Sequence, residues 1–484
     1  MVDVTEMEAE NEDALKANRA NLQFLFPFML DKDKIGDFVR KLQKENFSFF
    51  SLKDLSLENR FYGENRVSHR SLEKFFLPNI EPILFPEKVE DIEGFRRFTK
   101  KLDLRCEFES KHLYTKFKIL SIDLFICPFH IGMTNIRVEL PEDLSYSDVL
   151  HFGDVFRVME PIDEDQEDSK IIHETGEYSK MKDFIFKALC PFMSDYMDHQ
   201  PNASYFGSLP FFIDERMYVI GYIEVPADSN ITQTGLYRAS QLNGYDVNGE
   251  PAVGALNPDY IKRYYDDKVY DRWADQTYYV TSDDNFMCVT RAHGELATHL
   301  ASEMYGYHYY SLLLYYYYKI VLMKLTHDHS VIDVEKDHSE TELLIFMITE
   351  FSAKYFFPEV NSRASGKELF HIIKEAFRID YLFDHVENTL DRLYQNQENL
   401  SSRRNNYLLQ ILTTYTVISG IYGMNLVIHD WEGKIKWSKI PGYTVFEWIS
   451  LITAVSGIII SAFLGFHALR HWLREKSSLK KKIF

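Results

Sequence analysis

Residues 407–428 read YLLQILTTYTVISGIYGMNLVI, and none of these 22 residues carries a charge. As a helix, a run of this length spans roughly 30 Å, the thickness of the hydrocarbon layer of a membrane. A second uncharged run of 22 residues, WISLITAVSGIIISAFLGFHAL, occupies residues 448–469. The sequence therefore predicts two transmembrane helices near the C-terminus. A pair of buried core helices is the alternative.

The basic residues around the two runs indicate how the chain crosses the membrane. Arg403 and Arg404 precede the first run, and six further lysines and arginines lie in residues 470–484, after the second. The positive-inside rule then places both termini in the cytoplasm and the connecting loop, residues 429–447, outside. We expect a multi-pass protein of the cell (plasma or inner) membrane. Its basic C-terminal tail would lie along anionic lipid headgroups.

The remainder of the chain has a very different charge. Residues 403–484 have a net charge of +7, whereas residues 1–402 have −26, within a total of −19. This acidity argues against a nucleic-acid binder, which needs a basic face, and suits a protein whose partners are cations. Four widely spaced cysteines form no CxxC pair, which excludes a disulfide scaffold and a cysteine-rich zinc site. P-loop, HExxH and GxSxG motifs are absent from the sequence, so we expect neither an enzyme nor a resident cofactor.

The acidic part of the chain has the pattern of an α/β cytosolic domain. The runs FKILSIDLFICPF (117–129), TNIRVELP (134–141) and the end of YFGSLPFFIDERMYVIGYIEVP (205–226) predict strands. Residues 293–325 and 341–357 predict a helical hairpin that Pro358 ends, with 309–325 as a possible third span. The predicted organisation is an acidic tail (1–21), an α/β domain (22–290), a helical hairpin (291–364), a stalk entering the first span (365–428), an external loop (429–447), a second span (448–469) and a basic cytosolic tail (470–484).

The stalk is predicted from a long stretch without helix breakers. No proline or glycine occurs between Gly366 and Gly420, and apolar residues recur at heptad spacing, at Ile372, Ala376, Ile379, Phe383, Val386, Leu390 and Leu393. We therefore expect one helix from near Lys367 into the first span. Such a helix must pack on neighbours, and its continuation into a membrane span favours a symmetric oligomer.

An acidic stripe runs beside this seam, at Asp380, Asp384, Glu387, Asp391 and Glu398. One interpretation is a solvated helix face. The other is that Asp384, Glu387 and Asp391 meet neighbouring subunits, where like charges repel unless a divalent cation neutralises them. The second interpretation predicts a regulatory metal site that responds to cytosolic ion concentration.

The tripeptide Gly423-Met424-Asn425 stands at the outer end of the first span. A short loop, one last span and a basic tail follow it. In residues 365–484 the sequence resembles the CorA-like magnesium transporter family. The resemblance implies a homopentameric funnel in the lipid bilayer, whose first span lines a pore and whose Asn425 residues ring the outer mouth as a selectivity filter. Magnesium would be substrate and regulatory ligand, drawn inward by the membrane potential.

Followed inward from Asn425 at helical spacing, one face of the first span is expected to pass Thr416, Thr413, Leu409, Asn405, Ser402 and Asn399. We expect this row to line the pore, because it is placed on the same face as Asn425. Only Leu409 of this row is apolar, whereas the family has an apolar constriction there. The family's mid-span proline is also missing. The external loop lacks the family's acidic segment and offers Asp430 and Glu432 instead. These departures leave two alternatives open: a zinc or cobalt transporter of the same family, and a non-conducting, membrane-anchored binding or signalling protein.

Overall fold

The computed structural model divides the chain into two units, Met1–Glu387 and Asn388–Phe484. The structure describes residues 15–142, 144–160, 169–198, 216–333, 337–361, 364–425, 437–453, 455–457, 459 and 463. For residues 403, 404, 417–425 and 439 it describes the backbone and not the side chain.

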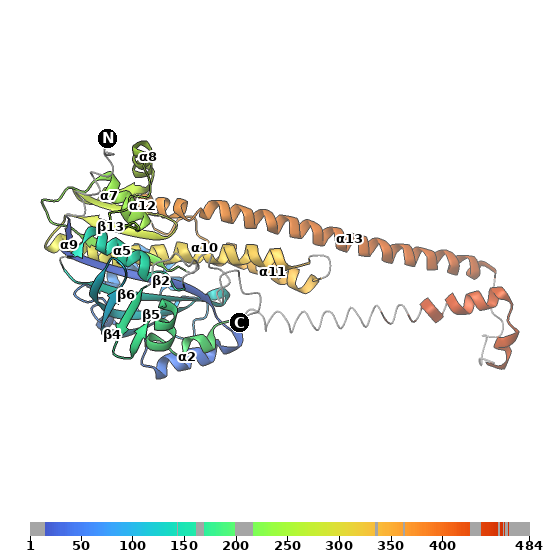
Figure 1. Cartoon of the computed structure of the whole chain (residues 1–484). Helices are drawn as coiled ribbons and strands as arrows, with labels where there is room; N and C mark the ends of the chain where they lie inside the picture. The colour runs from blue at the N-terminus through green and yellow to red at the C-terminus, as the bar shows by residue number, and fades with distance from the viewer. Residues whose placement is uncertain are drawn as a thin grey trace. The chain divides into compact units, whose positions relative to one another are not determined.

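The first unit is built on a large mixed sheet (Figure 1). Ten of its strands follow the order β11-β12-β13-β10-β2-β6-β5-β4-β8-β9, with β3 pairing β4 as the eleventh. The β10–β13 pair is parallel, and the other pairs of this sheet are antiparallel. A separate pair joins β1 to β7. The strands are β1 (Lys16–Ala17), β2 (Arg19–Met29), β3 (Ser48–Phe49), β4 (Arg96–Glu109), β5 (Tyr114–Ile126), β6 (Ile131–Leu140), β7 (Leu144–Ser145), β8 (Lys170–His173), β9 (Gly176–Tyr178), β10 (Tyr218–Glu224), β11 (Val269–Tyr270), β12 (Thr277–Thr281) and β13 (Asn285–Thr290).

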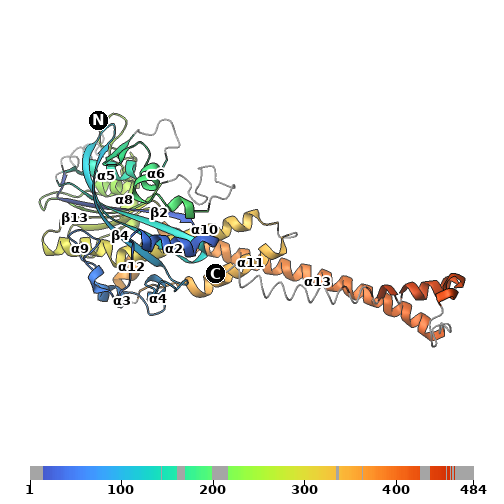
Figure 2. The ribbon, with the colours of Figure 1, turned by 90° about the horizontal axis from the view of Figure 1, so that it is seen from below.

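Helices cover both faces of this sheet, and α10 and α11 lie side by side in both views (Figures 1 and 2). Phe24 of β2 packs on α5. The side chain of its neighbour Gln23 points to the other face of the strand and donates to the Met304 carbonyl of α9. The helices are α2 (Ile35–Lys44), α3 (His69–Phe75), α4 (Glu81–Leu84), α5 (Tyr146–Phe156), α6 (Met181–Phe184), α7 (Gln233–Gln241), α8 (Pro258–Lys268), α9 (Glu295–Tyr305), α10 (Tyr307–Val331), α11 (His338–Glu350), α12 (Ala364–Ala376) and α13 (Ile379–Asn425).

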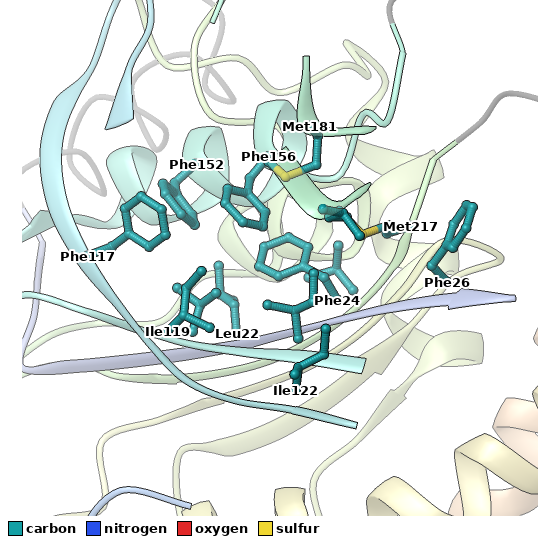
Figure 3. Close-up of a cluster of buried hydrophobic side chains, with 14 of the residues drawn as sticks. Leu22, Phe24, Phe26, Phe117, Ile119, Ile122, Phe152, Phe156, Met181 and Met217 are labelled. Atoms are coloured by element: carbon teal, nitrogen blue, oxygen red, sulfur yellow. The ribbon is translucent and has the colours of Figure 1, made fainter. Parts of the chain in front are cut away.

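One face of the sheet is apolar (Figure 3). Leu22 and Phe24 of β2 meet Phe152 and Phe156 of α5, and the Phe24 and Phe156 rings lie 4.4 Å apart. Because side chains alternate between the faces of a strand, alternate residues of β2 and of the second half of β6 enter this core, and β5 does the same on either side of a register shift between Ile119 and Ser121. Burial of these side chains supplies the main stabilisation of the unit, at roughly 1.5–3 kcal/mol for each large apolar residue.

The opposite face is polar and lies under α9 and α10. Asp123 of β5 is fully buried between Arg97 and Arg137, with Asp123 Oδ1 3.1 Å from Arg97 Nη2 and 2.9 Å from Arg137 Nη1. Burial alone would raise the pKa of Asp123, but the two guanidinium groups outweigh it and lower that pKa. Arg97 Nη1 donates a hydrogen bond to the Tyr310 hydroxyl, and the centre of the Tyr309 ring lies 5.5 Å from the Arg137 guanidinium. The tyrosine-rich sequence of α10 therefore supplies hydroxyls and ring faces to buried charges.

A second buried carboxylate lies where α9 meets α10. Glu303 Oε1 is 3.0 Å from His299 Nε2, and Glu303 is only 8% exposed. Burial alone would raise the pKa of Glu303, but His299 and His308 lower it to about 2. Because the pKa of Glu303 is lower in the folded state than in the unfolded state, the ionised carboxylate stabilises the fold. This stabilisation is fully present above the unfolded-state pKa of about 4.5 and is lost as the pH falls towards 2.

We therefore expect Glu303→Gln to change how stability depends on acid. The wild type should lose about 3 kcal/mol more than the variant between pH 5 and pH 2, because only the wild type must protonate this carboxyl. Denaturant unfolding at several pH values measures the difference. Parallel curves for the two proteins would contradict the assignment.

The strand predictions are confirmed at three places and need one boundary change. The predicted runs at 117–129 and 134–141 overlap β5 and β6, which each begin three residues earlier, and the run at 205–226 contains β10, although 205–215 lies outside the described residues. The predicted acidic tail is too long, because β2 begins at Arg19 and lies in the middle of the sheet. Pro27 is tolerated in this strand because pairing of β2 with β10 ends at Leu25.

The predicted hairpin is confirmed with one interruption. Gly306 separates α9 from α10, and α10 then packs against α11. A π-helical turn, Phe351–Tyr355, extends α11 to just before Pro358. Residues 309–318 of α10 are buried inside this unit. This burial is what a packed helix of the unit requires, and it does not support the interpretation of 309–325 as a third membrane span.

The prediction of one unbroken helix from Lys367 is wrong. The chain breaks at Phe377 and Arg378, and Arg378 adopts a left-handed φ of 53°. The reason is a change of buried face. Phe370 of α12 and Ile379 of α13 are both buried, yet nine residues are about two and a half turns, so one straight helix would bury only one of them. Phe377 anchors the break, with its ring 5.4 Å from Tyr218.

Candidate ion-conducting helix

Helix α13, Ile379–Asn425, carries all the predicted pore and regulatory positions except the external loop acids. The helix continues through Gly423 and Met424 and ends at Asn425, so the tripeptide lies in its last turn. The backbone therefore supports a helix over residues 407–425 of the predicted first span. Residues 426–428, together with Asp430 and Glu432, lie outside the described residues.

The predicted pore row is exposed along its whole length. Thr413 and Thr416 each donate their hydroxyl to a backbone carbonyl one turn earlier, at Leu409 (2.7 Å) and Leu412 (2.8 Å). These hydroxyls satisfy their donors inside the helix and keep their lone pairs for an outside donor such as water. The exposed members of the row are Asn399, Ser402, Asn405, Leu409, Thr413 and Thr416.

The row and the acidic stripe have the same helical phase. Asp384, Glu387 and Asp391 are exposed, as the solvated-face interpretation and the metal-site interpretation both require. A regular α-helix turns about 100° per residue, so Asp391 and Thr416, which are 25 residues apart, differ by about 20° around the axis. Among the described residues, no group of three histidine, cysteine, aspartate or glutamate side chains is placed to hold a metal ion. The regulatory site stays a prediction.

Asn425 does not share that phase. The sequence hypothesis puts Asn425 and Thr416 on one face, but nine residues of continuous helix are about two and a half turns. Because α13 runs unbroken through both positions, they lie on opposite sides of it. Grouping the two on one face is therefore incorrect for a regular helix.

A second helix of the same unit begins at residue 445, three residues before the predicted span, and is described at 445–453 and 455–457. Thr444 directly precedes this helix, and its backbone carbonyl accepts a hydrogen bond of 3.1 Å from the Trp448 N–H. Its Ser456 Oγ lies 2.8 Å from the Tyr415 hydroxyl of α13. Gly457 packs beside the Tyr415 ring, and a Cβ at Gly457 would lie 3.7 Å from that ring, an ordinary van der Waals distance. Much of the predicted second span, and the tail 470–484, lie outside the described residues.

An apolar groove lies beside this contact. Its volume is about 460 Å³. It is lined by Trp437, Ile440, Leu451, Ile452, Val455, Ser456 and Ile459. Among the described residues, no helix is both long enough and apolar enough to cross a membrane.

No family model, no curated protein and no solved structure matches this chain.

The sequence interpretation missed the buried charges of the first unit. Asp123 and Arg137 lie inside the two clearest strand runs, FKILSIDLFICPF and TNIRVELP. A charged residue inside such a run is a signal, because an isolated buried charge is strongly unfavourable. The two runs pair as β5 and β6, which brings the opposite charges together.

Proposed function

We propose that the chain is a channel-like membrane transporter that carries hydrated Mg²⁺, or a related divalent cation, through a pore lined by α13 of several copies. The observation that carries the proposal is Gly423-Met424-Asn425 at the C-terminal end of α13, before a short connection and a second helix. The resemblance to the CorA-like family adds the expectation of a pentamer. Both predicted spans continue into residues outside the described set.

The chemistry of the motif suits magnesium. Mg²⁺ loses its water shell reluctantly, so a pore that carries it benefits from groups that bond the shell without replacing it. A ring of Asn425 amides offers carbonyl oxygens and N–H donors of this kind. The inward driving force is the membrane potential, about 4.6 kcal/mol per 100 mV for a divalent ion. The proposal therefore needs no nucleotide hydrolysis.

The remaining polar face of α13 supports the same proposal. Within the predicted span its exposed row includes the polar Thr413 and Thr416, whereas lipid-facing positions of a span are expected to be apolar. The exposed carboxylates of Asp384, Glu387 and Asp391 lie on the same helix, on the N-terminal side of the row. Such an arrangement attracts cations to the cytosolic end of a pore.

The test is ion entry into proteoliposomes that hold the wild-type chain, with dyes for Mg²⁺, Zn²⁺ and Co²⁺ and an inside-negative potential. Saturable Mg²⁺ entry above that of empty vesicles is expected. Entry of Zn²⁺ or Co²⁺ without Mg²⁺ would assign the related ion instead.

A non-conducting binding or signalling protein is the second candidate. The observation in its favour is the half-turn between Asn425 and Thr416, which separates the motif from the exposed row. If none of the three ions enters the vesicles although the protein in them has the mass of an intact oligomer, the result would favour the binding or signalling protein.

Regulation by cytosolic magnesium gives a separate prediction. If Asp384, Glu387 and Asp391 bridge subunits through Mg²⁺, the wild type should resist protease and heat better in about 20 mM Mg²⁺ than in chelator, by several degrees in Tm. The triple variant Asp384→Asn, Glu387→Gln, Asp391→Asn should lose most of this difference. An equal Mg²⁺ effect in both proteins would place the ion elsewhere.

A further inference from the structure

The contact between the two helices of the second unit shows which side of α13 is covered. The Tyr415 hydroxyl lies 2.8 Å from Ser456 Oγ, and its ring lies against Gly457. Leu408 precedes Tyr415 by seven residues, so the two lie about 20° apart around the axis. Both are half-buried, while Tyr407, Leu409 and Leu412 are exposed. The second helix therefore covers the side of α13 marked by Tyr415 and Leu408.

Over residues 399–416, where the described side chains of α13 end, the side opposite Tyr415 is polar. At about 100° per residue, five of these residues lie between about 140° and 180° from Tyr415. All five carry polar, uncharged side chains, and all are exposed. They are Asn399, Ser402, Asn406, Gln410 and Thr413. In an oligomer that keeps its second helices outside, this side faces the symmetry axis.

Gln410 is the most informative member of the set. Apart from Asn425, it is the only amide side chain in the predicted span 407–428. Polar side chains within a span are costly against lipid and almost always face a bundle interior or a water-filled cavity. Because the chain's own second helix lies on the other side of α13, its own partner span does not shield Gln410. The amide must meet water or neighbouring copies.

We propose that Gln410 lines the ion pathway and forms a second amide ring, about 22 Å inward of Asn425 along α13. This inference rests on the proposed transport function. On a regular helix, position 410 lies about 60° from position 425 around the axis, nearer than position 413 at about 120° and position 416 at about 180°. Like the Asn425 ring, five Gln410 amides would hydrogen-bond the water shell of a divalent ion.

Cysteine substitution tests the assignment. Cysteines placed around a pore bind Cd²⁺ through their thiolates and block it. The four native cysteines are buried and unpaired, which keeps the background low. Gln410→Cys and Thr413→Cys should lose at least about fivefold of their Mg²⁺ entry in micromolar Cd²⁺, and a chelator should restore it. Matched controls are Ile411→Cys and Leu412→Cys, which lie on the Tyr415 side and should be unaffected.

Two results would overturn the inference while leaving transport intact: block at Ile411→Cys or Leu412→Cys, or no block at Gln410→Cys. A second readout does not require transport. Under mild oxidation in vesicles, Gln410→Cys copies should form interchain disulfides more than about fivefold faster than Leu412→Cys copies. Equal rates would overturn the placement of Gln410 at the axis. Failure of the wild type to carry any ion would instead count against the proposed function.

Discussion

Replacing Asp123 by asparagine is expected to cost the first unit about 3–5 kcal/mol of unfolding free energy, because it leaves two buried guanidinium groups without a counter-charge. Asp123, Arg97 and Arg137 are each at most 1% exposed, so water cannot replace the lost carboxylate. Asp123 also accepts a bond of 2.8 Å from Thr99 Oγ1. The measurement is urea unfolding of the full chain in detergent, followed by tyrosine fluorescence.

Two further variants make this prediction informative even if Asp123→Asn does not fold. Thr99→Val removes the bond to this carboxylate and the bond that the Thr99 hydroxyl accepts from Arg97 Nε (3.0 Å), and should cost about 2–3 kcal/mol. Asp275→Asn changes an aspartate that is 90% exposed and should shift stability by less than about 0.5 kcal/mol. A similar small effect for Asp123→Asn and Asp275→Asn would show that the buried charges do not hold α10 to the sheet.

Replacing Asn425 by alanine is expected to lower Mg²⁺ entry at least about tenfold, because each lost hydrogen bond to the hydrated ion is worth about 1 kcal/mol and the ring loses several together. Oligomer mass and protein yield should stay as in the wild type. Initial rates of Mg²⁺ entry into proteoliposomes measure the effect. The change removes only the amide, and the backbone of α13 tolerates alanine well.

Leu412→Ala is the control for Asn425→Ala, because it shortens an exposed side chain of the same helix on the side away from the polar set. Its entry rate should match the wild type within about twofold. Wild-type rates in Asn425→Ala would remove Asn425 from the ion pathway and leave the motif without a role in selectivity.

Local patterns were sufficient to predict several elements. The alternation of β-branched and aromatic residues around Asp123 and Arg137 predicts β5 and β6, and both strands form. Helical zones of the first unit follow from their apolar content, and α10 and α11 pack as the predicted hairpin. These predictions succeed because period and residue type are set by the segment itself.

Contacts between distant segments decided the rest. The apolar seam of Ile379 and Val386 predicts the buried side of α13 correctly, since both are at most 2% exposed. A second apolar set, Leu369, Phe370 and Ile373, has a different phase, and its burial breaks the predicted stalk at Arg378. Neither set alone reveals the break, because it arises from what each helix packs on: α12 contacts α10 and β12, whereas Phe383 of α13 stacks on Phe356.

The phase of the candidate pore was the hardest feature to read from sequence. A row traced along the sequence joins Asn425 to Thr416, whereas the continuous helix separates them. Only the contact of Tyr415 with Ser456 shows which side of α13 is covered, and this contact joins residues 41 positions apart. The packing of one helix on another selects among faces that sequence periodicity leaves equivalent.

The most direct test of the central claim is Mg²⁺ entry into proteoliposomes that hold the wild-type protein, compared at zero and at inside-negative potential. The account predicts entry that exceeds that of empty vesicles, saturates with Mg²⁺, and rises several-fold with 60 mV of inside-negative potential, worth about 2.8 kcal/mol for a divalent ion. Entry no faster than in empty vesicles at either potential, from a protein of confirmed oligomeric mass, would contradict it.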